Sequence, residues 1–351
     1  MFDGPRLPEL DPAERLARLR LARTPRIGPV SFHEALAHVG SARAACREIA
    51  ALPEARVRQE EEALLALGGH FLVFGDTSYP ATLAALPDAP PVLSAIGDID
   101  LLGRRTLAIV GARNASMAGR RLAGDFAAGL GQAGFAIASG LARGIDTAAH
   151  EAALATGTLA VLAGGLDHVY PPENARLQEA IARQGLLLSE MPLGTPPVAQ
   201  AFPRRNRIVS GLSAGVIVIE AAARSGSLIT AQRAAEQGRE VLVVPGSPLD
   251  PRYEGSNSLI RDGAILVCNA NDITGVFGQP QCLSQPTVKS IQKHLDSDTA
   301  KIVTELGAAP TAVDELVRRC QVSAATVAEV LLALELEGRL ERHRGNRVSL
   351  I

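Results

Sequence analysis

From Thr106 onward, short apolar runs alternate with longer stretches of helical spacing. The runs are TLAIV (106–110), GFAIAS (134–139), TLAVLAG (158–164), GLLLS (185–189), GVIVIE (215–220), REVLVVPG (239–246) and AILVC (264–268). Apolar runs that do not alternate with polar residues are typical of strands buried on both faces, and the helical stretches between them supply the covering layers. This pattern predicts an α/β fold with a doubly wound, mostly parallel sheet.

The segments around this region predict four parts. Residues 1–68 have apolar positions three and four apart and are expected to form a helical domain. The α/β domain is expected over 69–277, with a proline-rich connector at 79–93. The polar segment 278–298 is typical of a linker. Residues 299–351 have the order of three helices and a hairpin, which predicts a winged helix.

Several protein classes are excluded by short-range patterns. No window approaches 18 uncharged apolar residues, so no membrane span is expected, and the N-terminus lacks the apolar core of a signal peptide. The four cysteines are far apart, which favours reduced thiols in the cytoplasm and no metal site. The first strand runs into GARNAS, where a dinucleotide fold has GxGxxG, and no P-loop is present. We therefore expect no cofactor.

The net charge of −2 hides an uneven distribution. Residues 101–150 contain six arginines and only two aspartates, and residues 199–239 contain six arginines and only two glutamates. The rest of the chain is correspondingly acidic. Positive charge in two segments rich in glycine and serine favours a polyanionic ligand such as nucleic acid.

Two of the predicted strands end in turns suited to an anion. Gly111 permits a tight turn before Arg113, and the helix beginning near Ser116 is expected to direct unpaired N–H groups at a phosphate. The next strand ends at Ser139, Gly140 and Arg143. Because ligands of doubly wound folds bind beyond the carboxyl ends of the strands, these residues are candidates for phosphate contacts.

The segment FPRRNR offers a second group of candidates. Arg204, Arg205 and Arg207 lie at the start of an expected helix, where positive charge opposes the helix dipole and an anion would relieve it. Asn206 lies among them. Phe202 precedes them, and the residues alone leave open whether it stacks on a base or packs at the entry of the helix.

The end of a later strand adds Ser225, Gly226 and Ser227 as a further phosphate cradle. Glu220, at the end of the same strand, is interpreted either as a catalytic carboxylate or, preferably, as a partner that orients an arginine.

Asp146 and His150 lie four residues apart on one helix. They form either a metal or acid–base pair or, preferably, a helix-end carboxylate and a packed histidine.

These segments, in this order, resemble the DNA-processing protein A (DprA/Smf) family. The resemblance rests on IVGARNAS, ASGLARGIDTAAH, LAGGLDHVYPPEN, SEMPLG, FPRRNRIVSGLS, VIEAAARSGSLITAQRA and VPGSPLDPRYEGSNSLIRDGA, over about residues 70–270. The family usually has serine where this chain has Ala112, a change between small residues. Residues 1–68 resemble its sterile-alpha-motif-like domain, and the last fifty residues resemble its winged helix.

The resemblance implies an extended Rossmann-like domain in a homodimer that binds single-stranded DNA and has no catalytic residues. It also implies delivery of the strand to a RecA-type recombinase during natural transformation, with protection from nucleases and from single-strand-binding protein. Carried over by motif, Arg113 is a pocket arginine, Phe202 stacks on a base, and the phosphate ligands are Arg204, Asn206 and Arg207.

Two other functions remain open from the sequence. A nucleotide-processing hydrolase of the same superfamily would use a PGGxGT turn followed by glutamate, where this chain has SGSLIT with Glu220 before it. A regulator of duplex DNA would need a basic recognition helix, but SAATVAEVLLALELEG has three glutamates and no basic residue.

Overall fold

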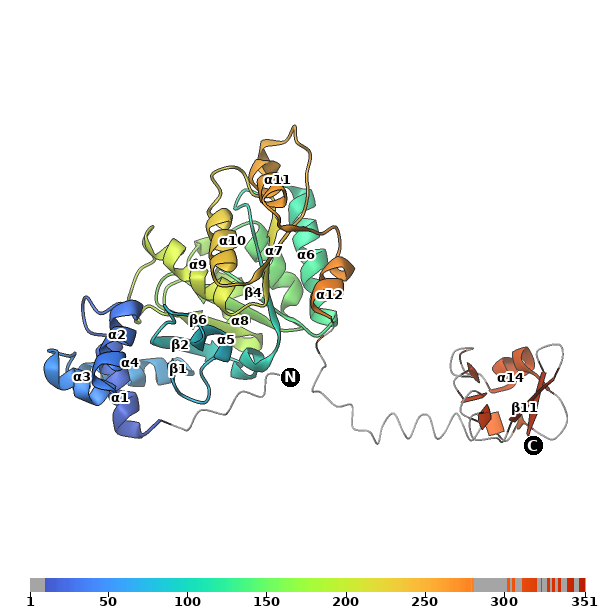
Figure 1. Cartoon of the computed structure of the whole chain (residues 1–351), viewed down its shortest axis with the longest axis horizontal. Helices are drawn as coiled ribbons and strands as arrows, with labels where there is room; N and C mark the ends of the chain where they lie inside the picture. Colours follow the sequence, from blue (N-terminus) through green and yellow to red (C-terminus); the bar gives the residue numbers. More distant parts are fainter. Residues whose placement is uncertain are drawn as a thin grey trace. The chain divides into compact units, whose positions relative to one another are not determined.

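The structure is a computed structural model that describes residues 10–278 and 280, and residues 302–350 with gaps at 304, 307–310, 321–322, 324–326, 329, 332–333, 336–339 and 344–346. Two compact units are present, Met1–Gln281 and Cys282–Ile351 (Figure 1). Of the predicted linker, only Gly278 and Pro280 are among the described residues.

Four helices precede the sheet, which confirms the predicted helical character for residues 10–68. They are α1 (Pro12–Ala22), α2 (Pro29–Val39), α3 (Ala42–Glu48) and α4 (Glu54–Ala66). Helix α1 begins after Asp11, whose carboxylate accepts a hydrogen bond from the Glu14 N–H and so caps the helix. Leu19 of α1 and Leu64 of α4 are fully buried in a cluster with Phe71, so these helices pack on the edge of the sheet.

Within residues 10–278, the strands form one sheet in the order β1-β2-β6-β5-β4-β3-β7-β8-β9. They are β1 (Gly69–Val73), β2 (Val92–Gly97), β3 (Thr106–Gly111), β4 (Ala136–Ser139), β5 (Thr158–Leu162), β6 (Leu186–Ser189), β7 (Gly215–Ile219), β8 (Glu240–Val243) and β9 (Ile265–Leu266). Strands β3 to β9 pair in parallel, and the direction of winding reverses between β3 and β7. The predicted doubly wound, mostly parallel sheet is confirmed, and all seven apolar runs are strands.

The sheet is wider than the seven apolar runs after Thr106 predict. Strands β1 and β2 pair with each other in antiparallel orientation, and β2 also pairs antiparallel with β6. The proline-rich segment interpreted as a connector contains α5 (Ala81–Ala84) and the start of β2. Pro90 and Pro91 directly precede β2. Because prolines are rare in central strands, the short apolar run after them was not predicted as a strand.

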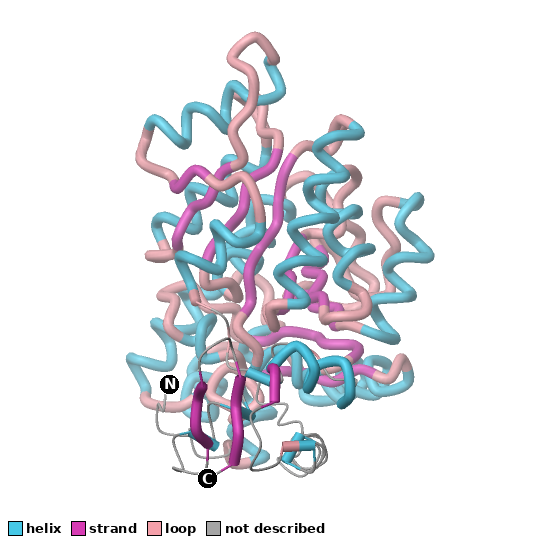
Figure 2. The backbone as a smooth tube through the Cα atoms, turned by 90° about the vertical axis from the view of Figure 1, so that its right-hand side faces the viewer, coloured by secondary structure: helices cyan, strands magenta, loops and turns pink. Residues whose placement is uncertain are grey.

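Helices cover both faces of the sheet (Figure 2). They are α6 (Met117–Gln132), α7 (Ile145–Ala153), α8 (Ala175–Gln184), α9 (Ala201–Gly211), α10 (Gly226–Glu236), α11 (Glu254–Arg261) and α12 (Ala270–Phe277), with short 3-10 turns η1 (Ile99–Gly103), η2 (Pro172–Asn174) and η3 (Pro251–Tyr253). Leu107 and Ile109 of β3 pack in one buried cluster with α6 and α7, whereas Ala108 and Val110 pack in another with α9 and α10. Alternate residues of one strand thus face two helical layers.

The second unit contains β10 (Thr311–Ala312), α14 (Val313–Cys320), β11 (Leu340–His343) and β12 (Arg347–Leu350). The strands pair antiparallel in the order β10-β12-β11. Leu316, Leu340 and Val348 are buried in one cluster, so the hairpin packs on the helix as in a winged helix. Among the described helices of the chain, none combines the length and apolar character that a bilayer crossing requires.

Candidate nucleic-acid interface

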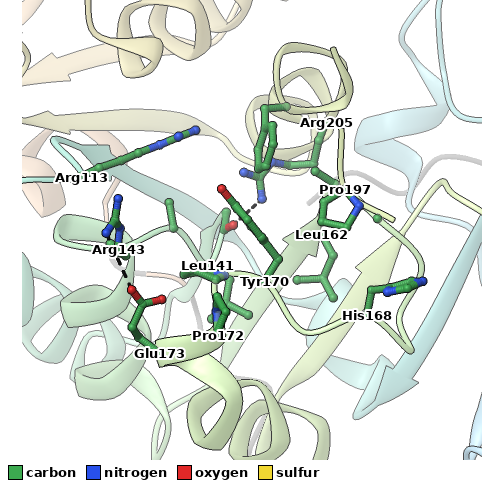
Figure 3. A pocket seen from close by; sticks show the side chains of 16 residues that line it. Arg113, Leu141, Arg143, Leu162, His168, Tyr170, Pro172, Glu173, Pro197 and Arg205 are labelled. Carbon is green, nitrogen blue, oxygen red and sulfur yellow. Dashed lines mark hydrogen bonds and ion pairs between the residues drawn. The ribbon is translucent and has the colours of Figure 1, made fainter. Parts of the chain in front are cut away.

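A pocket of about 210 Å³ lies at the carboxyl ends of β3, β4 and β5 (Figure 3). The ends of these strands, the loops that follow them, the segment between β6 and α9, and the start of α9 line it. The lining combines charged, aromatic and apolar side chains, among them Arg113, Arg143, Arg205, His168, Tyr170, Phe202, Leu162, Pro172 and Pro197. This is the edge of the sheet where doubly wound folds bind ligands. The volume of the pocket lies below the roughly 300–1,000 Å³ typical of sites that enclose a whole small molecule or cofactor.

Arg113 and two aromatic rings meet in this pocket. The Arg113 guanidinium carbon lies 5.2 Å from the centroid of the Phe202 ring, within the range of a cation–π contact. The Tyr170 ring centroid lies 5.4 Å from that of Phe202, with the ring planes inclined by 53°. Tyr170 was missed by the sequence reasoning. Its only signal was an aromatic residue before Pro-Pro in a loop that follows a strand.

Arg143 is the second exposed arginine of the pocket. Its guanidinium lies 3.7 Å from the carboxylate of Glu173, and both side chains are more than half exposed. An exposed ion pair of this kind stabilises the fold by at most about 1 kcal/mol. A phosphate could therefore replace Glu173 as the partner of Arg143 with little loss of free energy. The loop that carries Arg143 is held by Asp146, which accepts hydrogen bonds from the N–H groups of Gly140 (3.1 Å) and Ala142 (3.2 Å).

Arg205 lies beneath the pocket and is only 6% exposed. It donates hydrogen bonds to the carbonyl oxygens of Gly140 and Val161, and it faces Asp146. Burial lowers the pKa of Arg205 to about 10, and Asp146 opposes this effect. Burial likewise raises the pKa of Asp146, against the attraction of Arg205. Arg205 therefore joins the ends of β4 and β5 and fixes the floor of the pocket.

Asp146 and His150 do not form a metal pair. Asp146 binds the loop before its own helix, and His150 is fully buried with Nδ1 2.7 Å from the hydroxyl of Thr158. The region covered by the structure contains no group of three side chains suited to a metal ion. The packed-histidine interpretation is confirmed, and Asp146 is the acidic residue in the first turn of α7, where its carboxylate also binds the β4–α7 loop.

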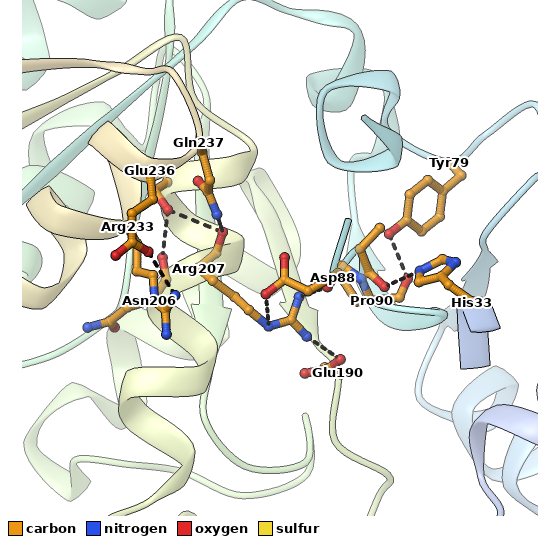
Figure 4. A network of polar contacts seen from close by, with 12 residues as sticks. His33, Tyr79, Asp88, Pro90, Glu190, Asn206, Arg207, Arg233, Glu236 and Gln237 are labelled. Atoms are coloured by element: carbon orange, nitrogen blue, oxygen red, sulfur yellow. Dashed lines mark hydrogen bonds and ion pairs between the residues drawn. The ribbon is translucent and has the colours of Figure 1, made fainter. Parts of the chain in front are cut away.

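The remaining residues of FPRRNR point in different directions. The side chain of Arg204 is exposed and makes no hydrogen bond or ion pair with the residues that the structure describes. Asn206 donates to the carbonyl of Gly226 at 3.5 Å. Arg207 is 6% exposed, and its guanidinium donates to the Glu190 carboxylate and to the Asp88 carbonyl, both at 2.5 Å (Figure 4). The sequence groups these arginines together, but of Arg204, Arg205 and Arg207 only Arg204 is free to meet solvent.

Other predicted site residues support the backbone. Ser139 is fully buried and donates to the carbonyl of Ile109 at 2.6 Å. A Cβ on Gly111 would lie 1.9 Å from the carbonyl oxygen of Ile219, so glycine is required where β3 passes β7. The hydroxyls of Ser225 and Ser227 lie 2.6 Å apart, and Ser225 caps α10. With the intervening Gly226, these two serines lie at the start of α10 and outside the lining of the pocket.

Glu220 fills the position at which the sequence predicts an external anion. It is fully buried, with φ of 52°, and its carboxylate accepts hydrogen bonds from the Ser116 N–H (2.8 Å), the Ser116 hydroxyl and the Tyr253 hydroxyl (3.0 Å). Ser116 in turn caps α6 through the Gly119 N–H. The start of α6 is thus satisfied by the chain's own carboxylate, and Glu220 bonds to no arginine within the described residues. The interpretations of an open phosphate cradle and of an arginine-orienting glutamate are both corrected.

Family models match three segments of the chain. Residues 70–278 match a model described as DNA recombination-mediator protein A, residues 286–346 a DprA winged helix domain, and residues 12–66 a DprA-like N-terminal HHH domain. Protein Smf of Escherichia coli is 41% identical over 290 residues, which cover 80% of this chain and 78% of that protein. DNA processing protein DprA of Streptococcus pneumoniae is 47% identical over 204 residues, which cover 58% of this chain and 72% of that protein.

Two solved structures resemble this one. DNA processing protein A of Streptococcus pneumoniae superposes with a TM-score of 0.63 at 34% identity, covering 76% of this chain and 98% of that one. DNA processing protein A of Helicobacter pylori, whose structure was described for its single-stranded DNA binding mode, superposes with a TM-score of 0.55 at 30% identity. The match covers 59% of this chain and 95% of that one.

Proposed function

The chain belongs to the family of DNA recombination-mediator protein A, and from this premise we propose that it binds single-stranded DNA in the pocket at the ends of β3, β4 and β5. One observation carries the proposal: two exposed arginines, Arg113 and Arg143, share a pocket with the aromatic side chains of Tyr170 and Phe202. Cations beside aromatic rings are the usual platform for a single strand, because phosphates bind the cations and bases stack on the rings. Arg204 extends the positive surface.

The pocket favours a single strand over a duplex. A base reaches an aromatic ring in a small concave pocket only when it is unpaired and turned outward. A gel-shift comparison of one oligonucleotide as single strand and as duplex tests this. We expect clearly tighter binding of the single strand, and equal binding of both forms would contradict the proposal.

We further propose the finer steps of the role. The bound strand is passed to a RecA-type recombinase during DNA uptake in the cytoplasm, while the protein, as a homodimer, excludes nucleases and single-strand-binding protein. The family description as a recombination mediator supports this role. A strand-exchange assay on DNA coated with single-strand-binding protein should show stimulation, and light scattering at micromolar concentration should give twice the mass of one chain. No stimulation, or the monomer mass alone, would contradict the corresponding step.

The hydrolase alternative has less support. Glu220, its candidate carboxylate, is fully buried at the start of α6 and lies outside the lining of the pocket. Incubation with nucleoside monophosphates tests it directly, because release of free base would establish hydrolysis.

Arg113→Ala is expected to weaken binding of all single-stranded sequences alike. Because one phosphate contact is lost, the slope of log K against log salt should decrease in magnitude by about 0.7. Fluorescence anisotropy over a salt series measures it. Arg183→Ala is the matched control, because Arg183 is also exposed. It lies in the last turn of α8, next to the amino end of β6, and so at the edge of the sheet opposite the pocket. An unchanged slope for Arg113→Ala would remove this residue from the interface.

A further inference from the structure

We propose that Asn174 is a positioning residue for the binding of single-stranded DNA. It holds the loop between β4 and α7, residues 140–144, in the conformation that directs the Arg143 guanidinium into the pocket. The inference rests on the proposed function. It assigns a role to a side chain that does not itself line the pocket.

The loop needs to be held because of Leu141. Its φ is 54°, in the left-handed region that residues with a side chain rarely adopt. The Leu141 side chain is fully buried in a cluster that includes Leu162 and Leu166, so the residue cannot change its conformation without leaving the core. A backbone of this kind persists only where the surrounding structure fixes it.

Asn174, the last residue of η2, donates the hydrogen bonds that the loop carbonyls need. Its Nδ2 donates to the Leu141 carbonyl at 3.0 Å and to the Thr147 hydroxyl at 2.9 Å. The Thr147 hydroxyl in turn donates to the Ala142 carbonyl at 2.8 Å. One buried amide, only 5% exposed, thus satisfies two successive carbonyls of the loop, the second of them through Thr147.

The position of Asn174 makes this arrangement informative. Asn174 is the N-cap residue of α8, where an asparagine side chain usually accepts a hydrogen bond from the first turn of its own helix. Here it makes no such bond and reaches the β4–α7 loop. Asp146 holds only the N–H groups of that loop, at Gly140 and Ala142, so removal of Asn174 leaves the Leu141 carbonyl without its donor.

The conformation of the loop decides where Arg143 lies. At the next residue, Gly144 with φ of 82°, the loop passes so close to the preceding turn that a Cβ would clash with the carbonyl oxygens of Ala112 and Arg113. Arg143 therefore projects beside Arg113, and Figure 3 shows both arginines on the same side of the pocket. A change of backbone at Leu141 would move Arg143 away from this position.

The first experiment removes the amide and keeps its shape. Asn174→Leu retains the branched side chain but has no N–H donor. Because one phosphate contact is lost, the slope of log K against log salt should decrease in magnitude by about 0.7, and binding of oligo-dT should weaken about 5-fold at 0.1 M salt. Fluorescence anisotropy over a salt series measures both. Asn174→Ala should give the same result without the bulk of leucine, and a parental slope in both variants would overturn the proposal.

Gln178→Leu is the matched control. Gln178 is a buried amide of α8, 6% exposed, and its Nε2 donates to the carbonyls of Leu166 and His168, both at 3.3 Å. Those carbonyls belong to the loop after β5, which carries no arginine. The salt slope of this variant should therefore equal that of the parent. A decrease as large as that of Asn174→Leu would show that loss of any buried amide lowers the slope, and would contradict the proposal.

The second experiment asks whether Asn174 acts through Arg143. Arg143→Ala alone should lower the slope by about 0.7. The double variant with Asn174→Leu should bind oligo-dT as Arg143→Ala does, because the contact that Asn174 positions is already absent. A merely structural role of Asn174 would give losses of affinity that add, and that result would overturn the inference.

Failure of the inference is distinguishable from failure of the proposed function. If the parent protein binds no single-stranded DNA, the function is wrong and the inference falls with it. If the parent binds and Arg143→Ala lowers the slope while both variants of Asn174 do not, the function stands and the inference is wrong. An unchanged slope for Arg143→Ala would also overturn the inference, because Asn174 would then have no phosphate contact to position.

Discussion

Replacing Arg207 with alanine is expected to lower the free energy of unfolding of the unit Met1–Gln281 by about 3 kcal/mol. The guanidinium holds the Glu190 carboxylate at 2.5 Å and lies 3.8 Å from the Asp88 carboxylate. Its loss leaves the carboxylate of Glu190, which is 14% exposed, without its cation. The estimate lies at the low end of the 3–5 kcal/mol range for buried pairs, because the side chain of Asp88 remains 35% exposed.

Urea unfolding followed by tyrosine emission measures this change. Without tryptophan, the emission comes from Tyr79, Tyr170 and Tyr253, which all belong to the unit that contains Arg207. Arg204→Ala is the matched control and should change stability by less than about 0.5 kcal/mol, since that side chain is exposed. The opposite result, a stable Arg207→Ala protein with a salt slope lower by about 0.7, would establish Arg207 as a phosphate ligand.

Acidification from pH 7 to pH 5 is expected to remove about 2 kcal/mol of stability through His150 alone. The Thr158 hydroxyl donates to the Ile137 carbonyl at 3.0 Å, so the Nδ1–H of His150 donates to Thr158 and Nε2 is the unprotonated atom. Nε2 is buried without a hydrogen-bond partner among the described residues. Burial, with a smaller contribution from Arg205, lowers the pKa of His150 to about 3.

The sign follows from proton uptake. In the unfolded chain His150 has a pKa of about 6.5 and binds a proton below that pH. In the folded chain it binds the proton only below about pH 3. The free energy of unfolding therefore decreases as the pH falls from about 6.5 to about 3. His150→Gln should remove this dependence, although it lowers stability at every pH. The raised pKa of Asp146 acts in the opposite direction and is present in both proteins. Urea midpoints at pH 7, 6 and 5 test the difference, with the exposed His38→Gln as control. Equal pH dependence in the parent and in His150→Gln would show that His150 is not buried in its neutral form.

Much of the fold can be predicted from local hydrophobic patterns in the sequence. The strand β3 is an uninterrupted apolar run whose residues all need to be buried, and only a sheet covered on both faces does this for seven such runs. Strand β2 was missed because prolines and a short apolar run are equally typical of a connector. Its strand character depends on pairing with β1 and β6, which lie far away in the sequence.

The candidate site divides in the same way. Gly140, Arg143 and Arg113 could be predicted because they lie at strand ends, which a parallel sheet gathers at one edge. The sequence by itself therefore determined the parallel part of the sheet from β3 to β9, its doubly wound arrangement and the edge at which we propose that the ligand binds. Only the tertiary structure decided which arginines are exposed: Arg205 and Arg207 meet the carbonyls of Gly140 and Asp88, distant in sequence, while Arg113 meets solvent. Periodicity predicts which face of a helix or strand is buried. It does not predict the partner of a long charged side chain, because that side chain can reach groups that lie far away in the sequence.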